Sequence, residues 1–131
     1  RGYNDGNTNY IPIRARSFEP PQSLRELKHN IDVFDKDTLD VFRNSNAYLF
    51  NYNFESVGDK RTLGIMLDEV PVEIHSKSGT SVDLYSMSGY LWKGMKDVIS
   101  ITDQHADDIN LLKMENQYLR GKIEDLERKI A

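Results

Sequence analysis

The sequence predicts an α+β protein, in which a small mixed domain with a short sheet is followed by a long C-terminal helix that forms a coiled coil. Three observations predict this fold class. An aromatic segment alternates as a strand does, turn signals recur through the middle of the chain, and the last third follows a heptad repeat. The length of 131 residues suits one domain rather than two.

Composition and charge exclude several classes of function. The chain has 17 Lys and Arg against 21 Asp and Glu, and its basic residues do not cluster, so we expect no nucleic-acid partner. The absence of cysteine excludes disulfides and thiolate metal sites. Its apolar runs are far shorter than the ~20 residues that span a bilayer, so we expect no membrane partner. Because the chain begins with Arg1, we expect a fragment or a processing product.

The first segment, residues 1–22, is expected to be an extended connector. It contains three of the four prolines and no helical or alternating period. Pro20 and Pro21 predict a stiff, extended approach to Gln22 and Ser23.

Two short helices are predicted next. The apolar residues of 23–34 recur every three or four positions, which favours a helix, although the β-branched residues there also fit a strand. Residues 35–44 begin with acidic side chains, as a helix N-terminus prefers, and place Leu39 and Phe42 on one face.

The middle of the chain predicts strands. Residues 47–55 alternate, and we expect their aromatic side to pack in the core rather than to bind a ligand. That side carries Tyr48, Phe50, Tyr52 and Phe54. Residues 62–71 predict a strand and then a helical turn that Pro71 ends. Residues 72–86 predict a β-hairpin around the turn at Ser78 and Gly79.

The C-terminal segment, residues 91–131, carries an unbroken heptad repeat. The predicted helix is roughly 60 Å long, so its apolar face must meet another chain. The oligomer seam comprises Ile109, Leu112, Asn116, Leu119, Ile123, Leu126 and Ile130. Ile at a, Leu at d and a buried Asn favour a parallel dimer, but polar layers at Thr102, His105 and Asn116 leave the number of chains open. At the head of this helix, Tyr90 and Trp92 are expected to anchor it to the mixed domain.

Ser23 and Lys28 form the pair that could carry chemistry. A serine hydroxyl becomes a nucleophile when a base removes its proton, and a lysine can be that base where burial disfavours its charge. On a regular helix the two side chains would lie about 140° apart, so a dyad requires a bend near Ser23 or a neighbouring subunit. In the alternative interpretation Ser23 caps a helix, Glu26 completes a capping box and Lys28 is solvated.

No metal or cofactor is expected. The histidines His29, His75 and His105 have no zinc-like spacing, and no phosphate-binding loop is present.

The order of features along the chain resembles the peptidase S74 family, the C-terminal intramolecular chaperone domains of phage tailspikes, tail fibres and neck appendage proteins. The resemblance covers about residues 18–131. The residues that match the family pattern are Ser23, Lys28, Asn30, Ile31, Gly64, Glu69, Val70 and Tyr90. Leu24 stands where the family usually has Asp, and Leu67-Asp68 stands where it has Ala-Gln, so this is a divergent member. The Gln22-Ser23 junction and Glu26 are most similar to the neck appendage branch.

The resemblance implies a homotrimer with a parallel trimeric coiled coil that helps the upstream fibre domains of the same polypeptide to fold. It also implies self-cleavage between Gln22 and Ser23, with Ser23 as nucleophile, Lys28 as base, Glu26 as a catalytic residue that orients Lys28 or the water, and Asn30 in support. The implied organisation is a connector over residues 1–22, a chaperone body over 23–90 and a coiled-coil helix over 91–131. The implied location is the host cytoplasm during virion assembly, with the parent protein in the virion tail or neck appendage. A competing hypothesis is a non-catalytic trimerisation cap or coiled-coil adaptor.

Overall fold

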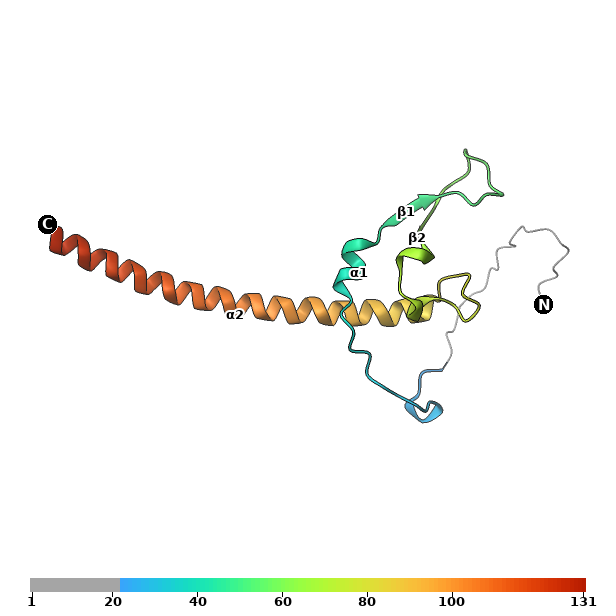
Figure 1. Cartoon of the computed structure of the whole chain (residues 1–131), viewed down its shortest axis with the longest axis horizontal. Helices are drawn as coiled ribbons and strands as arrows, with labels where there is room; N and C mark the ends of the chain where they lie inside the picture. The colour runs from blue at the N-terminus through green and yellow to red at the C-terminus, as the bar shows by residue number, and fades with distance from the viewer. Residues whose placement is uncertain (1–21) are drawn as a thin grey trace.

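The computed structural model describes residues 22–131, which form a small α+β body at one end of a long helix (Figure 1). The predicted fold class is thereby confirmed at the level of a small mixed domain, a short sheet and a long C-terminal helix. The connector predicted over residues 1–22 lies outside the described residues except for Gln22. The elements in order are η1 (Arg25–Leu27), α1 (Leu39–Asn44), β1 (Ala47–Phe50), β2 (Thr62–Ile65), η2 (Leu67–Glu69), η3 (Val72–Ile74) and α2 (Leu84–Ile130).

The sheet consists of β1 and β2, which pair antiparallel with Ala47 opposite Ile65 and Phe50 opposite Thr62. Tyr48 and Phe50 lie on its half-buried side, which confirms the alternation predicted there. The strand ends at Phe50, earlier than predicted. Beyond it the aromatic rings pack on one another, with the centroids of Tyr52 and Phe54 5.4 Å apart, while each residue stays 47% exposed.

The helix predicted over residues 23–34 is wrong, because only one 3-10 turn forms there. The backbone of Lys28 is extended, and Asn30 adopts a left-handed conformation with φ of 54°. Asn is among the few residues that tolerate this conformation, and the β-branched Ile31 and Val33 are weak helix formers. The helix predicted over residues 35–44 is present, but it is shorter than predicted and begins at Leu39 as α1.

The hairpin predicted over residues 72–86 is also wrong. The turn itself forms, with Gly79 at φ of 72°, but a single bridge between His75 and Val82 replaces the strands. Asp83 then begins α2, because its Oδ1 accepts the backbone N–H groups of Tyr85 (3.0 Å) and Ser86 (3.2 Å). The long helix therefore starts at Leu84 rather than at residue 91, and the boundary predicted at residues 90 and 91 falls inside α2.

Tyr90 is the centre of the contact between α2 and the body. Its side chain is buried, and its ring lies 5.8 Å from that of Phe34 and 5.6 Å from that of Phe42. Burial raises the pKa of the Tyr90 phenol. The predicted anchoring role is thus confirmed for Tyr90 but is wrong for Trp92, which is 76% exposed. Two residues along a helix turn by about 200°, so these two side chains leave α2 in different directions.

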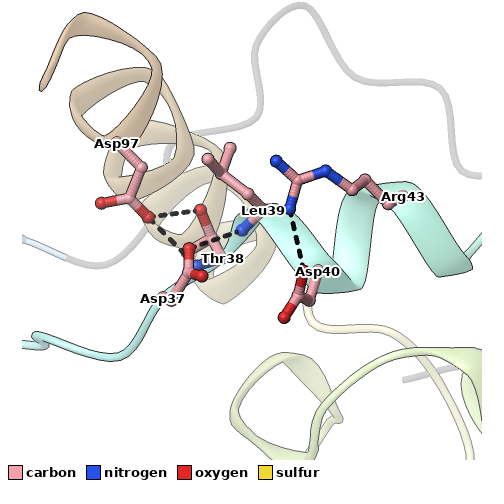
Figure 2. Close-up of polar contacts among 6 residues, drawn as sticks. All are labelled: Asp37, Thr38, Leu39, Asp40, Arg43 and Asp97. Carbon is pink, nitrogen blue, oxygen red and sulfur yellow. Dashed lines mark hydrogen bonds and ion pairs between the residues drawn. The ribbon is translucent and has the colours of Figure 1, made fainter. Parts of the chain in front are cut away.

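A polar contact joins the start of α1 to α2 (Figure 2). Thr38, the most deeply buried residue, donates its backbone N–H (3.0 Å) and its hydroxyl (2.7 Å) to Asp97 Oδ2. Lys93 forms an ion pair with the other oxygen of the same carboxylate. The hydrogen bonds from Lys93 and from Thr38 lower the pKa of Asp97 to about 2, so this contact persists in mildly acidic solution.

Beyond the body, α2 continues alone. Every residue from 98 to 131 is exposed, including all members of the oligomer seam. Within residues 22–131, no helix combines the length and the apolarity that a membrane span requires.

Candidate functional site

Ser23 and Lys28 lie in direct contact within one chain. The Lys28 ammonium Nζ lies 2.7 Å from Ser23 Oγ and 3.4 Å from the backbone oxygen of Ser23. The turn η1 between them makes this possible, because the extended backbone of Lys28 departs from a regular helix. The bend that the dyad requires is therefore present, and no second subunit is needed to bring the two groups together.

The alternative interpretation of Ser23 as a helix cap is wrong. Leu24 occupies the N-cap position of η1, and no side chain caps that turn. Since Ser23 Oγ contacts Lys28 instead, the predicted capping box with Glu26 does not form. Glu26 itself is exposed and forms no hydrogen bond or ion pair with any residue of 22–131, so the structure does not bring it to Lys28.

Asn30 contributes to the site through its backbone. Its left-handed conformation turns the chain directly after the Ser23–Lys28 contact. A residue with a β-branched side chain could adopt this conformation only with strain. The structure shows a bend of the chain at Asn30, and the supporting role expected for this residue stays a prediction.

Tyr85 is a third member of the cluster, and sequence reasoning missed it. Its hydroxyl oxygen lies 2.8 Å from Ser23 Oγ, although 62 positions separate the two residues. Asp83 positions Tyr85 by capping the first turn of α2. Recognition of Asp83 as a helix N-cap would have placed Tyr85 on a helix rather than in a strand, but nothing in the sequence indicates its contact with Ser23.

The cluster is open to solvent in the single chain. Gln22, Ser23, Lys28 and Tyr85 are all exposed, so the peptide bond between Gln22 and Ser23 is accessible beside the Lys28 amine. A serine hydroxyl, an amine and a phenol in this arrangement can support attack on an adjacent carbonyl, given a base form of the amine.

A separate open groove of about 690 Å³ runs along α2 beside Phe34, Tyr90 and Trp92. None of Ser23, Lys28 and Tyr85 lines it. The predicted Ser23–Lys28 pair therefore lies outside this groove.

No group of three or more His, Asp or Glu side chains among residues 22–131 is arranged to hold a metal ion. His75 has a structural environment, since its Nε2 lies 3.0 Å from the carbonyl oxygens of both Leu67 and Val70. His29 is exposed in the segment after η1, and His105 is exposed on α2.

Comparison of the chain with protein-family models, with curated proteins and with solved structures gives no significant match.

Proposed function

We propose that this chain is the C-terminal intramolecular chaperone of a phage fibre or appendage protein, which drives homotrimeric assembly and then releases itself by cutting the bond between Gln22 and Ser23. The observation that carries the proposal is the 2.7 Å contact between Lys28 Nζ and Ser23 Oγ, directly beside that bond. The resemblance to the peptidase S74 family supports the same pair of residues.

The reaction follows from the covalent connection of Ser23 to Gln22. Lys28, as the free amine, takes the hydroxyl proton while Ser23 Oγ forms a bond to the Gln22 carbonyl carbon, whose oxygen accepts the electron pair. The carbon–nitrogen bond then breaks, and Lys28 returns the proton to the nitrogen of Ser23. Water opens the resulting ester, which leaves a carboxylate on Gln22 and a free amine on Ser23. Because nucleophile and carbonyl belong to adjacent residues, the first step has a high effective concentration.

Assembly is supported by the exposed oligomer seam of α2. Its apolar residues stay 52–85% exposed in the single chain, and burying such surface contributes about 25 cal/mol per Å². The family resemblance implies that the partners are two further copies of this chain. Three long helices beside three upstream fibre chains would hold those chains in register and so reduce the entropic cost of a non-local β fold.

Cleavage depends on assembly in this proposal. Lys28 is exposed in the single chain, and a lysine acts as a base only where removal of water disfavours its charged form. Burial of the cluster by neighbouring subunits supplies that condition. The setting is the host cytoplasm during virion assembly, and the remainder of the protein stays in the virion tail or neck appendage.

The decisive experiment follows the intact mass of the purified chain with time. We expect the wild-type chain to lose residues 1–22 in a single turnover, and Ser23→Ala and Lys28→Ala to remain whole. Ser88→Ala, which alters an exposed serine on α2 outside the cluster, is the matched control and should cut normally. An assembled wild-type chain that stays whole, or a Ser23→Ala chain that is still cut, would leave the non-catalytic trimerisation cap as the function.

A further inference from the structure

Ser23 Oγ has two partners, one 5 positions and the other 62 positions away in the sequence. Lys28 Nζ lies 2.7 Å away on the segment after η1, and the Tyr85 hydroxyl lies 2.8 Å away on the first turn of α2. The cleavage proposal uses the first partner and leaves the second without a role.

Which hydroxyl donates in the contact between Ser23 and Tyr85 depends on the protonation state of Lys28. A charged lysine can only donate, so beside an ammonium the Ser23 hydroxyl receives from Lys28, and either hydroxyl can be the donor in the contact between Ser23 and Tyr85. Beside a neutral amine the Ser23 hydroxyl donates to Lys28, and the Tyr85 hydroxyl then donates to Ser23 Oγ. Formation of the base therefore leaves Tyr85 as the donor to the reacting oxygen.

We propose that Tyr85 is a third catalytic residue, whose hydroxyl donates a hydrogen bond to Ser23 Oγ. This inference rests on the proposed self-cleavage. During attack on the Gln22 carbonyl, Tyr85 holds the oxygen in position while Lys28 takes its proton. During ester opening, Lys28 takes a proton from water as the water oxygen forms the new bond to the carbonyl carbon, and Ser23 Oγ then leaves with the electron pair of the broken bond and receives that proton from Lys28. Tyr85 stabilises the charge on this leaving oxygen and keeps its own proton throughout.

The placement of Tyr85 suits this role. Asp83 Oδ1 binds the backbone N–H groups of the first turn of α2, and the backbone N–H of Asp83 is bound in turn by the carbonyl of Ile74 (2.9 Å), a buried core residue. The phenol therefore stands on a helix terminus that is tied to the core, whereas Ser23 lies on an exposed segment. A fixed donor of this kind is the arrangement that stabilises developing charge most effectively.

The test compares Tyr85→Phe with the wild type and with Tyr118→Phe, an exposed tyrosine on α2 outside the seam. Loss of one such donor typically slows a reaction on the order of 10²-fold, and we expect that loss of rate for Tyr85→Phe alone. Since the oxygen is the leaving group of ester opening, the ester should accumulate in Tyr85→Phe. The ester has the same mass as the uncut chain, so it is detected by treatment with hydroxylamine, which releases residues 1–22 as a hydroxamate.

Several outcomes would overturn the role of Tyr85. An unchanged rate of cutting in Tyr85→Phe would overturn it. A slow rate without accumulation of the hydroxylamine-labile ester would also overturn it, provided that the thermal midpoint and the oligomer size are those of the wild type. If Tyr85→Phe fails to fold, 3-fluorotyrosine at position 85 keeps the hydroxyl and makes it a stronger donor. It should speed ester opening, and an unchanged rate would overturn the role. If the Ser23→Ala chain is cut, both the proposed function and the role of Tyr85 are rejected. If cutting requires Ser23 but not Tyr85, only the role of Tyr85 is rejected.

Discussion

At the scale of single residues, the docking of the body on α2 depends on Gly94. A Cβ atom at Gly94 would lie 2.5 Å from Phe42 Cε2 and 3.3 Å from the hydroxyl oxygen of Thr38. Glycine in a helix interior costs up to about 1 kcal/mol relative to alanine, so its presence here has to be explained by packing. The close approach of α1 to α2 at this point is that explanation.

Gly94→Ala is therefore expected to destabilise the folded chain by roughly 1–3 kcal/mol, because Phe42 must move away from Tyr90 to admit the methyl group. The measurement is thermal unfolding in a Ser23→Ala background, which keeps all chains the same length. Gly121→Ala is the matched control on the same helix, where a Cβ would meet nothing within 4 Å. It should raise the unfolding midpoint slightly, and a rise for Gly94→Ala as well would contradict the packing explanation.

The cluster at Ser23 shows how far single residues can be predicted. Ser23 and Lys28 were predictable as a pair because they are close in sequence and the order of features around them is distinctive. Their contact was not predictable from helical spacing, because η1 is a single turn and the chain around Lys28 is extended. Tyr85 could not be predicted, because its contact with Ser23 arises from the way α2 and the N-terminal segment meet in space.

At the scale of elements, local sequence signals decided which predictions were correct. The heptad repeat predicted α2, since periodicity over many turns is difficult to mistake. The alternation of short segments was a weaker guide, because residues 72–86 have the composition of a hairpin and yet form a 3-10 turn, one bridge and a helix start. There the N-cap at Asp83 outweighed strand propensity.

The exposed part of α2 provides a test of the link between assembly and cleavage. Leu112→Asp combined with Leu119→Asp places charges on two d positions of the oligomer seam, whose leucines are 56% and 54% exposed in the single chain. We expect this double variant to be monomeric and to stop cutting between Gln22 and Ser23, because the cluster then stays solvated. Light scattering gives the oligomer size and intact mass gives the extent of cutting.

Met114→Asp combined with Gly121→Asp is the control for the seam variant, because it adds the same two charges, equally spaced, on the outward side of the same heptads. These chains should assemble and cut as the wild type does. A monomeric seam variant that cuts at the wild-type rate would show that the site works without its neighbours.

At the scale of the whole molecule, the core formed by residues 22–131 is small for a chain of 131 residues. Only Thr38, Ile74, Tyr90 and Gly94 are buried among residues 22–131. Domains with so small a core generally need disulfides, metals or association with other chains, and this chain has no cysteine. In the proposed assembly, self-association through α2 buries apolar surface, which fits a module that assembles other domains.

The proposed oligomer also allows a test of whether the Ser23 and the Lys28 of one dyad belong to the same chain. Because Lys28 lies 2.7 Å from Ser23 of its own chain, each subunit should cut only itself. We expect no cutting in mixed oligomers formed by co-expression of Lys28→Ala and Ser23→Ala chains, although every such oligomer contains intact copies of both residues. If the dyad were instead completed between subunits, the Lys28→Ala chain would be cut with the lysine of its neighbour, and its loss of residues 1–22 would appear in the intact mass. Mixed oligomers of wild-type and Lys28→Ala chains serve as the control, in which only the wild-type chains should be cut. This result would show that mixing does not by itself inhibit the reaction, so the absence of cutting in the complementation mixture would identify an intrachain dyad.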